Sequence, residues 1–187
     1  MPVLVALALG GNIEGLISEG LIRGDTGGRT SPVERTLAWA LRQLAASLGP
    51  LRAASLYRTR AVSPGLRRPQ PDFLNTAALV QTRLPADGVL ALAKALELAA
   101  GRRRGPRFGP RPLDVDLLLY GERRADDPEM TLPHPRLRER RFMLAPLAEI
   151  APDLPVPPDG ATVRELLARL GDATGDDAVE RIGWEGA

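Results

Sequence analysis

The sequence predicts an α+β fold in which an antiparallel sheet is flanked by helices. Apolar segments of strand length alternate with two longer segments whose apolar residues recur at helical spacing. Gly- and Pro-rich stretches separate these segments and mark the turns between them. The 187 residues are enough for one hydrophobic core and show no internal repeat, so we expect a single domain spanning residues 1–187.

For the first half of the core, the sequence predicts a strand, a helix and a second strand. VLVALAL at 3–9 is an apolar run, typical of a buried strand, that ends at Gly-Gly-Asn. From 32 to 48 apolar residues recur at helical spacing, and the Gly-Pro pair at 49–50 ends this helix. LRAASLYRT at 51–59 is the second strand. The Gly-rich segment 13–31 is weakly patterned, and we interpret it as an excursion between the first strand and the first helix.

For the second half of the core, the sequence predicts a strand, a helix and a further strand. The loop at 60–71 is too rich in Pro, Gly and Arg for regular structure. FLNTAALVQT at 73–82 is a strand, and the segment 85–101 has the Pro near its start and the Gly at its end that favour a helix. LDVDLLLY at 113–120 is the last core strand. The order β-α-β-β-α-β is that of a split βαβ or ferredoxin-like core.

The C-terminal residues add smaller elements. FMLAPLAEIA at 142–151 and TVRELLARL at 162–170 are each typical of a short helix. AVERIGW at 178–184 predicts a terminal strand.

Composition excludes several classes of site. There is no cysteine, so disulfides, thiol catalysis and zinc–thiolate sites are excluded. His134 is the only histidine, which excludes a metal site built from several histidines. The apolar run at 3–9 is too short to cross a bilayer and lacks the basic leader of a signal peptide. We therefore expect a cytoplasmic protein that does not contact a membrane.

The positive charge is almost entirely arginine. The formal net charge is +2, and Lys94 is the only lysine. The arginines are densest in GRRRGPRFGPR at 101–111 and RLRERR at 136–141. Arginine suits planar, bidentate contacts with phosphate, so these runs indicate phosphate binding. Codon bias and solvated surface charge are the alternatives.

Two carboxylates stand near the start of the last core strand, directly after the arginine-rich loop. Because side chains alternate across a strand, Asp114 and Asp116 share one face. Magnesium is typically held by one or two carboxylates together with substrate phosphates, so the pair indicates a magnesium and polyphosphate site. Charge balance with nearby arginines is the alternative. No Walker-type loop occurs, which excludes an ordinary P-loop kinase. The opposite face of the strand is expected to carry Leu113, Val115, Leu117 and Leu119.

These residues resemble a known family. RFGPRPLDVDLLLY at 107–120 is similar to the signature of the 6-hydroxymethyl-7,8-dihydropterin pyrophosphokinases (2-amino-4-hydroxy-6-hydroxymethyldihydropteridine diphosphokinases) of folate biosynthesis. The resemblance continues through ALGGN near the start, SLYRT at 55–59, PDFLN at 71–75, ELAAGR at 97–102 and LPHPRLRERRFMLAPLAEIAPDL at 132–154. A basic loop, Gly-Pro-Arg and Asp-x-Asp at fixed spacing form a specific signal, and the ferredoxin-like arrangement is the fold that the family implies.

The resemblance implies an ATP-dependent pyrophosphokinase. The enzyme would transfer the β,γ-pyrophosphoryl group of ATP to the primary alcohol of the hydroxymethyl-dihydropterin, giving the pterin diphosphate and AMP. Asp114 and Asp116 would coordinate two Mg²⁺ ions that bridge the ATP phosphates. Positioning and charge neutralisation would carry most of the catalysis. The partners would be these two small molecules, with no nucleic acid and with a monomeric chain.

The resemblance also implies roles for individual residues. The loop at 102–110 combines irregular Gly- and Pro-containing backbone with several arginines, so we expect it to be poorly ordered alone and ordered when ATP and the pterin are bound. The catalytic residues would be Arg102, Arg111, Asp114 and Asp116. ATP would be bound by Glu97, Arg102, Arg104, Arg107, Arg111, Leu117, Thr131, His134 and Arg140. The pterin would be bound by Thr59, Val62, Phe73, Asn75, Phe108, Asp114 and Phe142. Structural roles are the alternative for His134, which lies between two prolines, and core packing is the alternative for the three phenylalanines.

Two other functions share this topology. RNA-recognition modules have the same element order and basic surfaces, but they stack bases on strand aromatics, and aromatics are only 4% of this sequence. A ligand-binding regulatory domain of the same fold would need neither Asp-x-Asp nor an arginine loop. Release of AMP from ATP in the presence of the pterin separates the three.

Overall fold

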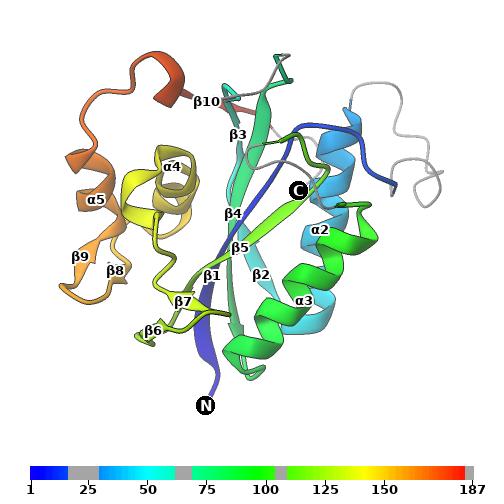
Figure 1. The fold of residues 1–187 in the computed structure, drawn as a ribbon. Coiled ribbons are helices and arrows are strands. Elements are labelled where there is room, and N and C mark those ends of the chain that lie inside the picture. Colours follow the sequence, from blue (N-terminus) through cyan, green and yellow to red (C-terminus); the bar gives the residue numbers. More distant parts are fainter. Residues whose placement is uncertain (17–29, 62–68, 104–108, 184–187) are drawn as a thin grey trace.

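A central antiparallel sheet lies between two layers of helices in the computed structural model of the chain (Figure 1). The structure describes residues 1–16, 30–61, 69–103 and 109–183. This arrangement confirms the predicted α+β class with an antiparallel sheet flanked by helices. Within the described ranges, no helix is long and apolar enough to span a membrane.

The sheet has six strands, and β1 (Val3–Gly11) is an interior strand next to one edge of the sheet. β1 pairs on one side with β4 (Phe73–Thr82) and on the other with β5 (Asp114–Tyr120). β3 (Leu56–Thr59) lies beyond the start of β4, and β10 (Val179–Ile182) pairs with β3 at the edge of the sheet. The order β10-β3-β4-β1-β5 therefore places the end of β1 and β3 and the start of β4 and β5 at one end of the sheet.

The predicted strand at 51–59 is two strands in the structure. β2 (Leu51–Ala53) pairs with the far half of β4, whereas β3 pairs with its start. Between them, at Ala54 and Ser55, the register against β4 shifts by one residue. The hydroxyl of Thr76 donates to the carbonyl of Ala54 at 2.9 Å, and the backbone N–H of Ser55 donates to Glu149 at 3.1 Å.

The helices divide between the two faces of the sheet (Figure 1). α2 (Pro32–Leu48) and α3 (Ala86–Ala99) cover one face, and α4 (Arg141–Ile150) and α5 (Val163–Arg169) lie over the other. α2 begins at a capping box, because Ser31 accepts from the backbone N–H of Glu34 while the Glu34 carboxylate accepts from that of Ser31. Short elements complete the chain: the pairs β6 (Ala125–Asp126) with β7 (Thr131–Leu132) and β8 (Pro155–Val156) with β9 (Ala161–Thr162), and the 3₁₀ turns η1 (Leu137–Glu139) and η2 (Gly175–Asp177).

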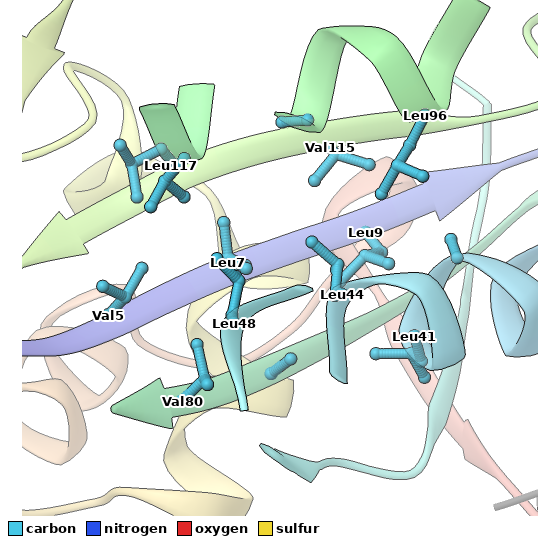
Figure 2. Packing of buried hydrophobic residues seen from close by; sticks show 14 of the residues in the cluster. Val5, Leu7, Leu9, Leu41, Leu44, Leu48, Val80, Leu96, Val115 and Leu117 are labelled. Atoms are coloured by element: carbon cyan, nitrogen blue, oxygen red, sulfur yellow. The ribbon is translucent and has the colours of Figure 1, made fainter. Parts of the chain in front are cut away.

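Each face of the sheet has its own hydrophobic core. Figure 2 shows the first core, where Leu7 and Leu9 of β1 lie among Leu44 and Leu48 of α2 and Val115 of β5. The second core lies between the sheet and α4, and its fully buried members include Leu118, Leu137, Met143, Leu144 and Leu147. The sheet is therefore buried on both sides.

The alternation of β5 side chains between the two faces of the sheet is interrupted after Leu117. Leu7 of β1 faces Leu117 but the preceding Ala6 faces Leu119, so Leu118 is an additional residue in β5, a β-bulge. Leu118 and Leu119 consequently both pack on the α4 side, whereas Leu117 packs against α2 and α3. The prediction that Leu119 shares a face with Leu117 is wrong for this reason. The bulge comes after both acids and does not separate them.

Candidate active site

A cavity of about 360 Å³ opens at the end of the sheet where β1 and β3 finish and β4 and β5 begin. This volume is in the range of small-molecule sites, which is roughly 300–1,000 Å³. The start of α4 and the segment before β10 close its sides. The charged side chains that line it are Arg60, Arg111, Asp114, Asp116, Arg136, Glu139, Arg140 and Asp177.

Asp114 is held by two arginines. Nη1 of Arg102 lies 2.5 Å from its Oδ1, and Nη1 of Arg111 lies 2.8 Å from its Oδ2. Burial alone would raise the pKa of Asp114, but the two guanidinium groups outweigh burial and lower it below its ordinary value. Asp114 is therefore ionised, and its orientation is fixed from both sides.

Asp116 lacks such partners. Within the described residues, no side chain or backbone group donates a hydrogen bond to its carboxylate, although the residue is largely buried. Burial raises its pKa to about 6, and the neighbouring charge of Asp114 adds to this effect. A buried carboxylate without a donor is costly unless a cation joins it.

The two acids fit a divalent cation of the magnesium type. Such ions prefer oxygen ligands and take part of their coordination from phosphate and water. Across the described residues no group of three His, Asp or Glu side chains could hold a metal unaided. Asp114 and Asp116 therefore suit an ion that arrives with a polyphosphate better than one that resides in the protein alone.

Glu97 supports the site from behind the cavity. Only 3% of Glu97 is exposed, and its Oε1 accepts the backbone N–H of Val115 at 2.9 Å. The same oxygen forms an ion pair with Arg102, and Lys94 lies 3.1 Å from Oε2. Burial raises the pKa of Glu97 despite these cations. The side chain thus joins the end of α3 to the start of β5 and holds Arg102 beside Asp114.

A second polar pair lies on the floor of the cavity. Nδ2 of Asn75 donates to Oγ1 of Thr59 at 2.9 Å, and both residues are buried. Oδ1 of Asn75 lies over Gly10 of β1, where an added Cβ would be 2.6 Å away. The glycine at this position therefore leaves the space that the amide of Asn75 occupies.

Asn12, in the Gly-Gly-Asn turn, connects three loops around the cavity. Its Nδ2 donates to Oε1 of Gln70 and to the carbonyl of Pro71, each at 3.0 Å, and its Oδ1 accepts the backbone N–H of Arg111 at 2.9 Å. Sequence reasoning did not include Asn12 in the site. The signal for it was the Gly-Gly-Asn turn that ends the first strand.

Two aromatic rings line the cavity from different elements. Phe73 is the first residue of β4, and Phe142 lies in the first turn of α4. The guanidinium carbon of Arg140 lies 5.3 Å from the centroid of the Phe142 ring, a cation–π geometry. Phe142 also packs against the second core, so its ring belongs to both the core and the cavity wall.

His134 lies beside the basic part of the site. Its Nδ1 accepts the backbone N–H of Arg136 at 3.2 Å, so the neutral ring carries its proton on Nε2 and can donate from there. Burial lowers its pKa to about 4, and the charge of Arg140 adds to this. His134 is therefore a neutral donor at pH 7.

We expect the single histidine to titrate near pH 4 rather than near 6.5. The unfolded chain then binds more protons than the folded chain between these values, so the contribution of His134 to stability is fully present above pH 6.5 and is lost as the pH falls toward 4. A proton NMR titration of the imidazole signals measures the pKa directly. An inflection at pH 6 to 7 would contradict the buried, neutral state.

Comparison with known proteins identifies the family. Residues 6–152 match the sequence model of 7,8-dihydro-6-hydroxymethylpterin-pyrophosphokinase (HPPK). The chain belongs to this family.

Curated relatives of the HPPK family agree with this assignment. The chain is 39% identical over 146 residues to a 2-amino-4-hydroxy-6-hydroxymethyldihydropteridine pyrophosphokinase of Synechocystis sp., covering 77% of this chain and 73% of that protein. It is 42% identical over 144 residues to the protein of the same name from Methylorubrum extorquens, covering 77% of this chain and 89% of that protein. The resemblance inferred from the sequence motifs is confirmed.

Solved structures of HPPK-DHPS proteins share the fold. The triple mutant of Plasmodium falciparum HPPK-DHPS crystallised with STZ-DHP has a TM-score of 0.64 and 12% identity, covering 90% of this chain and 43% of that chain. The wild-type protein crystallised with SDX-DHP has a TM-score of 0.61 and 13% identity, covering 89% of this chain and 43% of that chain. The chain thus spans less than half the length of these structures.

The fold brings together most of the site residues expected from the HPPK resemblance. Arg102 and Glu97 lie directly behind Asp114, and His134 lies near Arg140. Leu117 packs in the first core, and Thr131 is exposed on β7; neither side chain lines the cavity. The cavity wall contains Thr59, Phe73, Asn75, Arg111, Asp114, Asp116, Arg140 and Phe142. The proposed contacts of Val62, Arg104, Arg107 and Phe108, and the ordering of the 102–110 loop, concern residues that lie wholly or partly outside the described ranges.

Sequence reasoning missed several residues of the cavity wall. Arg136 belongs to the basic run at 136–141 and could have been included on that ground. Asp177, Ala178 and Val179 belong to the C-terminal segment, which follows the region matched by the HPPK family. Their short, common side chains gave no sequence signal. Only the pairing of β10 with β3 brings them to the site.

Proposed function

We propose that this cavity transfers the pyrophosphoryl group of ATP to 6-hydroxymethyl-7,8-dihydropterin, giving the pterin diphosphate and AMP. The chain is a pyrophosphokinase by family, and the family acts in folate biosynthesis. The observation that carries the assignment to this cavity is Asp116, a buried acid without a donor that stands beside the arginine-bound Asp114. This arrangement suits a cation and a polyphosphate at the mouth of an aromatic pocket.

The charged half of the cavity is the proposed binding site for the ATP phosphates. Asp114 and Asp116 would hold two Mg²⁺ ions, which would neutralise phosphate charge and polarise the phosphoryl group. Arg111, Arg136 and Arg140 line the same wall and would contact the phosphate oxygens that face the protein. Neutral His134 would donate a hydrogen bond from Nε2. These groups are oriented before the substrate binds, which favours catalysis by positioning and charge stabilisation.

The other half of the cavity is the proposed pterin site. Phe73 and Phe142 present rings from two elements, as a flat bicyclic substrate requires for contact on both faces. Asn75 has an Oδ1 that accepts no hydrogen bond from a described side chain, while its Nδ2 is fixed by Thr59. The polar edge of the pterin would supply donors to that oxygen. The acceptor alcohol would then point toward Asp114 and Asp116.

The same proposal includes the remaining properties expected from the sequence. We propose two magnesium ions per active site, ATP and the pterin as the partners, no nucleic acid, and a monomeric enzyme in the cytoplasm organised as a single domain over 1–187. The pairing of acids and arginines in one cavity supports the small-molecule partners. A sheet surface for stacking RNA bases would instead present aromatics on its central strands.

The proposed reaction is tested by product analysis. Incubation with ATP, Mg²⁺ and the hydroxymethyl-dihydropterin is expected to release AMP and pterin diphosphate in equal amounts. A pterin that lacks the hydroxyl group is the control for the acceptor, and chelation of Mg²⁺ is the control for the metal; neither reaction should give AMP. Release of ADP or phosphate in place of AMP would contradict pyrophosphoryl transfer.

A further inference from the structure

The C-terminal segment forms one wall of the pterin half of the cavity. Asp177, Ala178 and Val179 line it, and they lie after the region 6–152 that matches the HPPK family. In Figure 1 the segment passes from α5 across the top of the molecule and ends as β10 beside β3. The cavity therefore includes residues that the family match does not cover.

Strand pairing fixes this wall relative to the proposed pterin contacts. Val179 of β10 lies opposite Thr59 of β3, and Thr59 lies opposite Phe73 of β4. Residues opposite each other in antiparallel strands point to the same face, so the three side chains form a row across the sheet. All three line the cavity. β10 is four strands away from β5, roughly 19 Å at the usual strand spacing, and so lies far from Asp114.

Two polar anchors hold the segment at its ends. Arg141, the first residue of α4, is buried and donates from Nε to Asp177 at 2.9 Å and from Nη2 to the carbonyl of Gly171 at 2.7 Å. At the other end Arg181 donates to Oγ of Ser55 at 2.9 Å and lies 3.1 Å from Glu149 of α4. Glu149 also accepts from the Ser55 hydroxyl at 2.8 Å.

These anchors connect the wall to the helix that carries Phe142. Arg141 is the neighbour of Phe142 in sequence, and Glu149 lies at the other end of the same helix. The wall and the ring are thus positioned by shared contacts. If the segment moved away, the buried Arg141 would lose Asp177 as its partner, and an unpaired buried arginine is costly. This contact therefore holds the segment in place in addition to strand pairing.

We propose that the segment Gly175–Ile182, comprising η2 and β10, limits the size of the acceptor bound in the pterin half of the cavity. The inference rests on the proposed function of that half. Ala178 and Val179 are small apolar residues of the cavity lining, and in this proposal they contact the acceptor and exclude water from it. The distance from Asp114 makes the effect specific to the acceptor rather than to ATP.

The test is substitution of Ala178→Leu in the full chain. The larger side chain is expected to weaken binding of the hydroxymethyl-dihydropterin at least tenfold, about 1.4 kcal/mol, and to change the affinity for a non-hydrolysable ATP analogue less than roughly twofold. Glu180→Leu is the matched control, because Glu180 lies on the same strand, is exposed, and does not line the cavity. This variant should bind both ligands like the original chain. Ala178→Ser, which hardly changes the volume, should retain pterin binding.

The outcomes separate the wall from the function on which it rests. If the unaltered chain fails to bind the pterin, the proposed function fails whatever the variants do. If it binds and Ala178→Leu behaves like Glu180→Leu, the wall proposal is wrong. Equal losses for pterin and ATP analogue would likewise overturn it, since they indicate a general structural role. Should Ala178→Leu melt too low for titration, Ala178→Val carries the same test with a smaller expected loss.

Discussion

Asp116→Asn is expected to reduce turnover roughly 100- to 1,000-fold while raising the thermal stability of the protein in the absence of Mg²⁺. Activity falls because an amide is a much poorer ligand for the cation that the phosphates require. Stability rises because burial and Asp114 lift the pKa of Asp116 to about 6. At pH 7 the ionised form therefore costs the fold on the order of 2–3 kcal/mol, and asparagine removes this cost.

Asp114→Asn should cause a similar loss of activity with the opposite effect on stability. Arg102 and Arg111 would lose the carboxylate that now accepts hydrogen bonds from their Nη1 groups. Loss of one partner of a charged pair in a partly buried site typically costs about 1–3 kcal/mol of stability. Turnover and melting temperature, each measured with and without Mg²⁺, check both variants. Asp126→Asn, an exposed acid on β6, is the control.

The opposite signs make this pair of variants informative. A purely structural role for the acids would lower the melting temperature in both cases and would leave activity in proportion to the folded fraction. If Asp116→Asn kept near-normal turnover at millimolar Mg²⁺, its assignment as a metal ligand would be wrong.

Phe142→Ala is expected to weaken pterin binding at least tenfold, about 1.4 kcal/mol, with a much smaller change in ATP affinity. The ring lines the cavity next to Arg140, and offset stacking on an aromatic substrate contributes roughly 0.5–1.5 kcal/mol beyond the area that it buries. Some loss of stability should accompany the change, because Phe142 also packs against the second core. Equilibrium titration with each ligand measures the two affinities separately.

Phe142→Leu is the matched control for the ring. It retains an apolar side chain toward the core but cannot stack on the pterin. The melting temperature should therefore return closer to that of the unaltered chain than the pterin affinity does. Equal weakening of both ligands by Phe142→Ala would point to a core role alone. An unchanged pterin affinity would remove Phe142 from the binding site.

Regular patterns in the sequence predict most of the fold. The helix at 32–48 and the strand at 73–82 have the predicted bounds, because Gly-Pro, a Ser-x-x-Glu box and proline-rich loops mark their ends. Asp114 and Asp116 could be predicted as well, because two acids near the start of an apolar strand stand out in the sequence. What these signals share is that each is local, within a few residues of the chain.

Features that depend on pairing between distant segments could not be predicted. No local pattern indicates that Leu118 is an extra residue, because four apolar residues in succession, from 117 to 120, fit either phase of a strand. The contribution of Ala178 and Val179 to the cavity depends on the register of β10 against β3, which is more than a hundred residues away. The support of Arg102 by Glu97 depends in the same way on where α3 ends relative to β5.

The extra residue in β5 has a consequence for the opposite side of the active site. Leu118 has no residue opposite it on β1, and its carbonyl accepts the backbone N–H of His134 at 2.9 Å. The irregularity in the ladder thus supplies the acceptor that fastens the loop leading to Arg136 and Arg140. Deleting Leu118 would leave both flanking pairings with β1 in register while removing this contact with the loop. The number of residues in a core strand, and not only their identity, therefore affects how the loop before Arg136 and Arg140 is held.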